Sequence, residues 1–160
     1  MKLYIQRGAG QKDGFTVYNE KAEPISTAVV RSGGLLGITI YDRSRSTVSE
    51  IRLNSFMLNY FSIRCCHRLY VLIPCSTTRF AFAIYGSTYR CMGSLADGRF
   101  SMIDSHGSTV MTQKKCRTPH GEGYELDISD RRYTLFMLSV AICADIYLTL
   151  SDTNPLAVSN

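Results

Sequence analysis

The chain has 160 residues, of which 45% are hydrophobic and 19% are charged, so it can build a folded core. This composition excludes an intrinsically disordered protein, and the length fits one domain. We place that domain at residues 1–150 and a short polar tail at 151–160. The net charge of +5 permits attraction to an anionic surface but does not require it.

The beginning of the chain predicts a cytoplasmic protein. Residues 1–7 reach Gly8 and Gly10 without the apolar stretch and small-residue cleavage site of a secretory signal. In a reducing compartment, cysteines are expected as free thiols and not as disulfides. That expectation covers all six cysteines: Cys65, Cys66, Cys75, Cys91, Cys116 and Cys143.

Most of the chain alternates apolar and polar residues over short segments that end in turn-forming residues. Phe15–Tyr18, Gly37–Tyr41 and Phe100–Ile103 are clear examples, each followed by Asn or Asp. The pattern predicts strands near 2–6, 14–19, 24–30, 35–41, 47–53, 58–64, 68–73, 79–85, 88–93, 98–104, 107–115 and 122–129. Their regular spacing is typical of an antiparallel meander that forms a sandwich or barrel.

The pattern changes after Ser129 or Asp130, either of which could cap a helix. From Tyr133 to Ala144 apolar residues lie on every side, within a strongly apolar stretch that continues to Leu150, so a helix over about 131–149 has no face to offer to solvent. A membrane tail anchor is the competing interpretation. Its uninterrupted apolar run is shorter than the ~20 residues that a bilayer needs, and Asp145 would lie within the span. We therefore expect no transmembrane span.

Enclosure by the strands accounts for such a helix. A barrel of about twelve strands is too wide for side chains alone to fill and needs an interior element. The predicted fold is therefore all-β with one central helix: a roughly twelve-stranded antiparallel β-barrel around an apolar C-terminal helix.

Four segments, in this order, resemble the LURP-one-related family, whose fold is similar to the tubby C-terminal domain. They are Phe15–Asn19, Ser94–Asp104, Tyr124–Ile128 and the apolar helix that ends in Ala144–Ile146. The resemblance covers nearly the whole chain and implies the same barrel and helix. Because related folds include phosphoinositide-binding tubby proteins and phospholipid scramblases, it also implies a lipid-headgroup or partner-binding role by analogy.

Motifs for cofactors are weak. The glycines at positions 8, 10 and 14 precede a strand and not the helix that a phosphate loop requires. Cys65, Cys66 and His67 are adjacent, and neighbours on a strand point to opposite faces, so they do not form a metal site. We predict no cofactor, no metal and no nucleic-acid partner.

Basic residues give the candidate binding positions. We assign Lys114, Lys115, Arg117, Arg131 and Arg132 to a barrel rim that contacts anionic phospholipid or a protein partner, with the protein peripheral to a membrane. The alternative is that these residues form an ordinary solvated rim. Asp145 either emerges at the barrel mouth into water or locks the helix end to strand-edge N–H groups.

Two function classes remain open. The first is a non-catalytic binding module that uses its barrel rim. The second is an enzyme with a thiol or carboxylate site at the barrel mouth. The absence of an acid/base pair, a phosphate loop or metal-ligand spacing favours the first.

Overall fold

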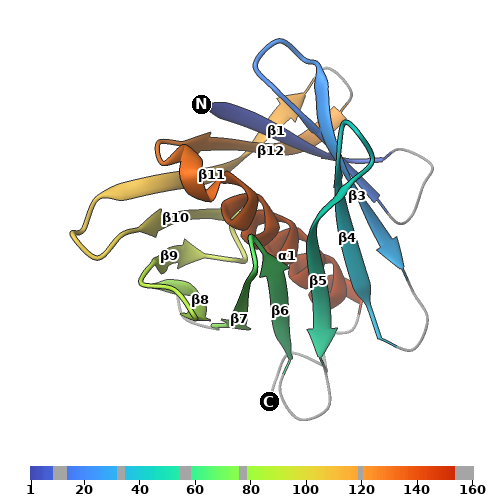
Figure 1. The fold of residues 1–160 in the computed structure, drawn as a ribbon. Coiled ribbons are helices and arrows are strands. Elements are labelled where there is room, and N and C mark those ends of the chain that lie inside the picture. Colours follow the sequence, from blue (N-terminus) through green and yellow to red (C-terminus); the bar gives the residue numbers. More distant parts are fainter. Residues whose placement is uncertain (9–13, 32–34, 55–58, 76–78, 119–120, 154–160) are drawn as a thin grey trace.

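The structure, a computed structural model, describes residues 1–8, 14–31, 35–54, 59–75, 79–118 and 121–153, without the side chains of 152 and 153. Over these residues twelve strands pair in chain order, each antiparallel to the next, and the last pairs with the first to close a barrel (Figure 1). They are β1 (Lys2–Arg7), β2 (Gly14–Tyr18), β3 (Pro24–Arg31), β4 (Gly37–Asp42), β5 (Thr47–Asn54), β6 (Tyr60–Cys65), β7 (Arg68–Pro74), β8 (Phe80–Tyr85), β9 (Arg90–Ser94), β10 (Arg99–Ile103), β11 (Thr109–Thr118) and β12 (Gly121–Ile128). The predicted fold class is confirmed.

Two of the hairpin turns are closed in the same way, by an aspartate side chain that bonds to the backbone of its own turn. Asp42 Oδ1 accepts hydrogen bonds from the backbone N–H groups of the residues two and four positions later, and Asp104 Oδ1 does the same in its own turn. This Asx geometry replaces strand pairing with a local turn. The fourth residue of each turn lies in the left-handed region: Arg45 at φ 63° and Gly107 at φ 85°. Local sequence thus sets these reversals.

The helical segment begins with a 3-10 turn, η1 (Arg131–Tyr133), and continues as α1 (Thr134–Thr153). Of the two predicted caps, Asp130 is the one that caps, because its side chain accepts a hydrogen bond from the backbone N–H of Arg132. The Ser129 hydroxyl instead donates to the carbonyl of Val110 in β11.

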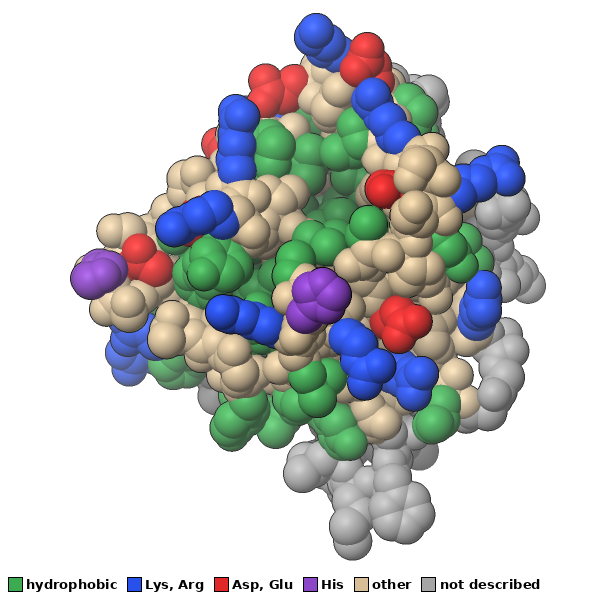
Figure 2. All heavy atoms as spheres, viewed as in Figure 1, with side chains coloured by type: hydrophobic (Ala, Val, Ile, Leu, Met, Phe, Trp, Pro, Cys, Tyr) green, Lys and Arg blue, Asp and Glu red, His purple; other side chains and the backbone are tan. Residues whose placement is uncertain are grey.

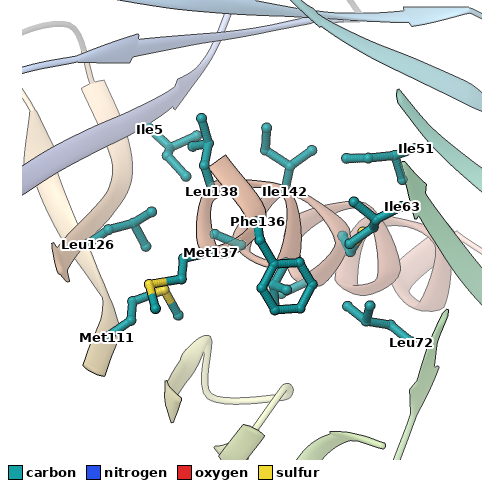
Figure 3. Close-up of a cluster of buried hydrophobic side chains, with 14 of the residues drawn as sticks. Ile5, Ile51, Ile63, Leu72, Met111, Leu126, Phe136, Met137, Leu138 and Ile142 are labelled. Carbon is teal, nitrogen blue, oxygen red and sulfur yellow. The ribbon is translucent and has the colours of Figure 1, made fainter. Parts of the chain in front are cut away.

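α1 runs through the barrel and supplies the centre of its core (Figure 1). Figure 3 shows Ile5, Leu126, Ile51 and Ile63 from the barrel wall around Phe136 and its neighbours on the helix. Every residue from Phe136 to Ile146 is buried except Asp145, which is partly buried. Side chains on all sides of the helix therefore meet strand side chains, as an apolar circumference requires.

The same helix would also pass a test for a membrane span based on length and composition alone. Residues Arg131–Ser151 have a mean hydropathy of 1.7 and are mostly buried inside the protein. Enclosure by the strands accounts for this apolar sequence without a bilayer.

Candidate functional site: a charged pocket at one barrel mouth

A pocket of about 400 Å³ opens at the barrel mouth where α1 ends, which we call the C-terminal mouth. Ile5 and Phe15 supply apolar wall, and most of the other lining residues carry charged or polar side chains. Its charged and phenolic side chains are Arg7, Lys115, Arg117, Glu122, Tyr124 and Asp145. With both carboxylates ionised, three cations face two anions, so the pocket carries a net charge of +1.

Strand register brings these side chains together. Tyr124 of β12 pairs with Ile5 of β1 on one side and with Lys115 of β11 on the other. Ile5 is 1% exposed and faces the core, and Arg7 follows two residues later on the same face of β1. Arg7 and Lys115 therefore reach the pocket from opposite sides of β12.

Arg7 connects β1 to the end of the helix. Its Nη1 donates to Thr149 Oγ1 at 2.8 Å, and its Nη2 lies 3.4 Å from Asp145 Oδ2. The guanidinium also lies over the Phe15 ring, 5.4 Å from its centre. Asp145 and Thr149 are four residues apart and share one helix face, so one arginine contacts two consecutive turns of α1.

Asp145 is the most constrained carboxylate of the pocket. Its side chain is 15% exposed, and Oδ2 has no hydrogen-bond donor among the described residues. Burial raises the pKa of Asp145 above its usual range, while Arg7, the Tyr124 hydroxyl and Lys115 favour the charged form. Asp145 is thus largely buried at the barrel mouth. It contacts β1 through a side-chain ion pair.

Tyr124 shares this environment. Burial raises the pKa of its phenol, and the adjacent Asp145 carboxyl, to which it hydrogen-bonds, raises it further. The phenol therefore stays protonated and acts as a hydrogen-bond donor in the pocket lining.

The structure separates the predicted basic residues. Lys115 and Arg117 line the pocket, whereas Lys114 forms an ion pair with Glu125 at 3.2 Å and does not line it. The predicted strand near 107–115 would place Lys114 and Lys115 at a strand end, with side chains that cover no neighbour, and both expectations were wrong. Both lysines lie within β11 and not at a strand end, and the alkyl chain of Lys115 packs over Gly98.

Arg131 and Arg132 lie at the other end of the barrel, in η1 at the start of the helix. Arg132 is held by Asp130, with Nη2 2.9 Å from Oδ2. Arg117 pairs with Glu122 near the start of β12, and Ile128 at the end of β12 lies about 20 Å further along the strand. Arg131 and Arg132 follow Ile128, so they lie far from the pocket. Figure 2 likewise shows Lys and Arg side chains spread over the visible face and interrupted by other surface, not gathered in one patch.

The mouth where the helix begins has cavities of its own. Two pockets of about 430 and 280 Å³ share Arg68, Tyr70 and Tyr133. Cys66 and His67 form the tight β6–β7 turn there, with φ values of 51° and 59°. No group of three His, Cys, Asp or Glu side chains within the described ranges could hold a metal ion. Burial raises the pKa of the neighbouring Cys65 to about 12, which makes that thiol a poor nucleophile.

Sequence reasoning missed Arg7, Glu122 and Tyr124. A signal for Arg7 exists, because Leu3, Ile5 and Arg7 share one face of a strand whose first two members are core residues. A basic residue that continues an inward-facing series at the end of a barrel strand indicates a lining position at the mouth.

Comparisons with known proteins support the fold alone. No protein-family model matches the chain, and no curated protein sequence matches it. Among solved structures, the X-ray structure of the Arabidopsis thaliana protein AT5G01750 aligns with a TM-score of 0.66 and 13% sequence identity. The alignment covers 91% of this chain and 90% of that one. At this identity the likeness shows that the two proteins share an architecture.

Proposed function

We propose that this chain is a LURP-one-related, tubby-like binding module without catalytic activity, and that it binds the phosphate group of an anionic ligand in the C-terminal mouth pocket. One observation carries the proposal: Arg7, Lys115 and Arg117, which come from two strands, line one concave site of about 400 Å³. Guanidinium and ammonium groups are the usual partners of phosphate oxygens. The cavity falls within the size range of small-ligand sites.

The shape of the site also favours an anion with an apolar part. Phe15 and Ile5 form wall next to the cations, and the Arg7 guanidinium is already positioned over the Phe15 ring. A lipid headgroup and a small soluble phosphate both offer this chemistry. The first source would make the protein peripheral to a cytoplasmic membrane surface, as the sequence predicts.

The experiment compares two neighbouring lysines of one strand. Lys115 lines the pocket, whereas Lys114 pairs with Glu125 outside it. The Lys115→Gln and Arg117→Gln variants are measured against Lys114→Gln, which removes the same charge from the same strand. Ligands are inorganic pyrophosphate, vesicles of phosphatidylcholine, and phosphatidylcholine vesicles that contain phosphatidic acid.

Binding should weaken in Lys115→Gln and Arg117→Gln and stay close to wild type in Lys114→Gln. It should also weaken with added salt, because partly exposed charges are screened. Binding of pyrophosphate without vesicle binding would identify the ligand as a soluble phosphate. Binding only to vesicles that contain phosphatidic acid would identify the ligand as a lipid. Equal losses in Lys114→Gln and Lys115→Gln would refute the pocket as the site. No binding of either ligand by wild type would refute the function and leave a protein partner as the next hypothesis.

A further inference from the structure

Arg7 cannot pair equally with the helix and with a bound anion, because its ion-pair partner on α1, Asp145, lines the same pocket. Its two terminal nitrogens contact Thr149 and Asp145. An anion that enters between Arg7 and Lys115 therefore arrives beside the Asp145 carboxylate. At short range, in a partly buried site, two negative charges repel strongly.

We propose that anion binding in this pocket is coupled to proton uptake by Asp145: the anion takes Arg7 as its counter-ion, and Asp145 binds one proton as it gives Arg7 up. This inference rests on the proposed function and adds its regulation. When no ligand is present, the Asp145 carboxylate pairs with Arg7 and so competes with the anion for this arginine.

Three features of the pocket support this exchange. The Arg7–Asp145 contact is long, at 3.4 Å, and Asp145 Oδ2 receives no hydrogen bond from the described residues, so the ion pair is weaker than an ideal bidentate pair. The side chain is mostly buried, which already disfavours its charged form. The Tyr124 hydroxyl remains as a hydrogen-bond partner for a neutral Asp145 carboxyl.

Other groups around Asp145 define the control variants. The charged and titratable side chains that share its pocket are Arg7, Lys115, Cys116, Arg117, Glu122 and Tyr124. Burial raises the pKa of the Cys116 thiol and of the Tyr124 phenol, so neither gains a negative charge near neutral pH. Glu122 is the other carboxylate and serves as the matched control. His120 lies outside the described residues and is tested separately, because an imidazole ordinarily titrates near neutral pH.

The direction of the pH dependence follows from the linkage. A neighbouring anion raises the pKa of Asp145, so the complex holds more protons than the free protein between the free and bound pKa values. Affinity must then increase as the pH falls through that interval, by up to about tenfold per pH unit for one proton. Below the free pKa no further gain is expected, because Asp145 is protonated before the anion arrives.

The experiment uses sulfate, because sulfate keeps a constant charge where phosphate esters titrate. Sulfate affinity is measured by NMR titration between about pH 5 and pH 8. The proteins compared are wild type, Asp145→Asn, Glu122→Gln and His120→Gln. Proton uptake by wild type on sulfate binding is measured directly in weakly buffered solution. Wild type should take up close to one proton per sulfate within the interval. Asp145→Asn should bind more tightly than wild type at the upper end of the range and show a flat profile. Glu122→Gln and His120→Gln should keep the wild-type slope.

Each result has a defined meaning. Sulfate binding without proton uptake by wild type would refute the coupling and leave the proposed function intact. A slope that persists in Asp145→Asn but disappears in Glu122→Gln or His120→Gln would also refute it, because the proton would belong to another group. If Asp145→Asn fails to fold, the wild-type proton count together with the Glu122→Gln and His120→Gln profiles still decides the question, because uptake that persists in both variants leaves Asp145 as the carboxylate of the pocket. Absence of sulfate, pyrophosphate and vesicle binding at every pH would instead refute the proposed function itself.

Discussion

Replacement of Phe136 by alanine tests whether the helix is the centre of the core. Phe136 is 2% exposed, and its ring packs on Tyr70 with the two ring centres 4.1 Å apart. Truncation of a buried Phe to Ala costs about 3–5 kcal/mol through lost burial and the cavity left behind. An aromatic pair adds about 0.5–1.5 kcal/mol beyond burial. Because Phe136 and Tyr70 also border a pocket of about 280 Å³ that water can enter, we expect a loss near the lower limit, about 3 kcal/mol.

Urea unfolding monitored by circular dichroism measures this loss in free energy of unfolding. Leu69→Ala is the matched control: it precedes Tyr70 on β7, but its side chain faces outward and is 56% exposed. The control should change the free energy of unfolding by less than about 1 kcal/mol. A Phe136→Ala loss as small as that of the control would refute the enclosed helix and favour a membrane role for it.

Three further predictions test specific contacts. Ser139→Ala should lower the free energy of chemical unfolding by about 1–3 kcal/mol, because it leaves the buried Ser49 hydroxyl without its partner. Ser49→Ala should lower it by at most about 1 kcal/mol, because Ser139 then keeps its bond to the helix backbone. Equal losses would contradict this. Gly93 and Gly107 both have positive φ, but a Cβ at Gly93 would lie 2.7 Å from a backbone oxygen and one at Gly107 would meet nothing within 4 Å. The melting temperature of Gly93→Ala should therefore be well below that of Gly107→Ala. Burial opposes ionisation of Glu125, but hydrogen bonds from Lys2 and Lys114 hold the pKa of its carboxyl below the usual range. Its ionised form therefore stabilises the fold above that usual range, and the contribution is lost as the pH falls through the lowered pKa. Glu125→Gln should flatten this acid-side decline in melting temperature, and an unchanged profile would exclude the effect.

The barrel and its helix could be predicted because local patterns determine them. Asp42 and Asp104 end strands with turn chemistry, and the apolar circumference of the helix demands enclosure. The predicted strands agree with the observed ones to within a few residues. The helical segment begins where it was expected, at Arg131, and extends to Thr153. These features depend on residues that are close together in sequence.

The pocket could not be predicted in the same way, because its composition depends on strand register. The β10–β11 pairing shifts at Ile103, and the adjacent residues Val110 and Met111 are both buried, which breaks the simple alternation. After such a bulge, sequence alone does not say whether Lys114 or Lys115 faces inward. The sequence also groups Arg131 and Arg132 with these lysines, because it does not show at which end of the barrel each segment lies. Arg131 and Arg132 lie at the mouth where the helix begins, and Lys115 lies at the mouth where it ends.

The most direct test of the central claim is to locate bound phosphate on the protein by NMR. Backbone amide and arginine Nε–H signals are followed during titration with inorganic phosphate. The account predicts saturable shifts centred on Arg7, Lys115 and Arg117, with Asp145 and Tyr124 responding beside them. Shifts centred instead on Arg68, Arg131 and Arg132, at the mouth where the helix begins, would contradict it.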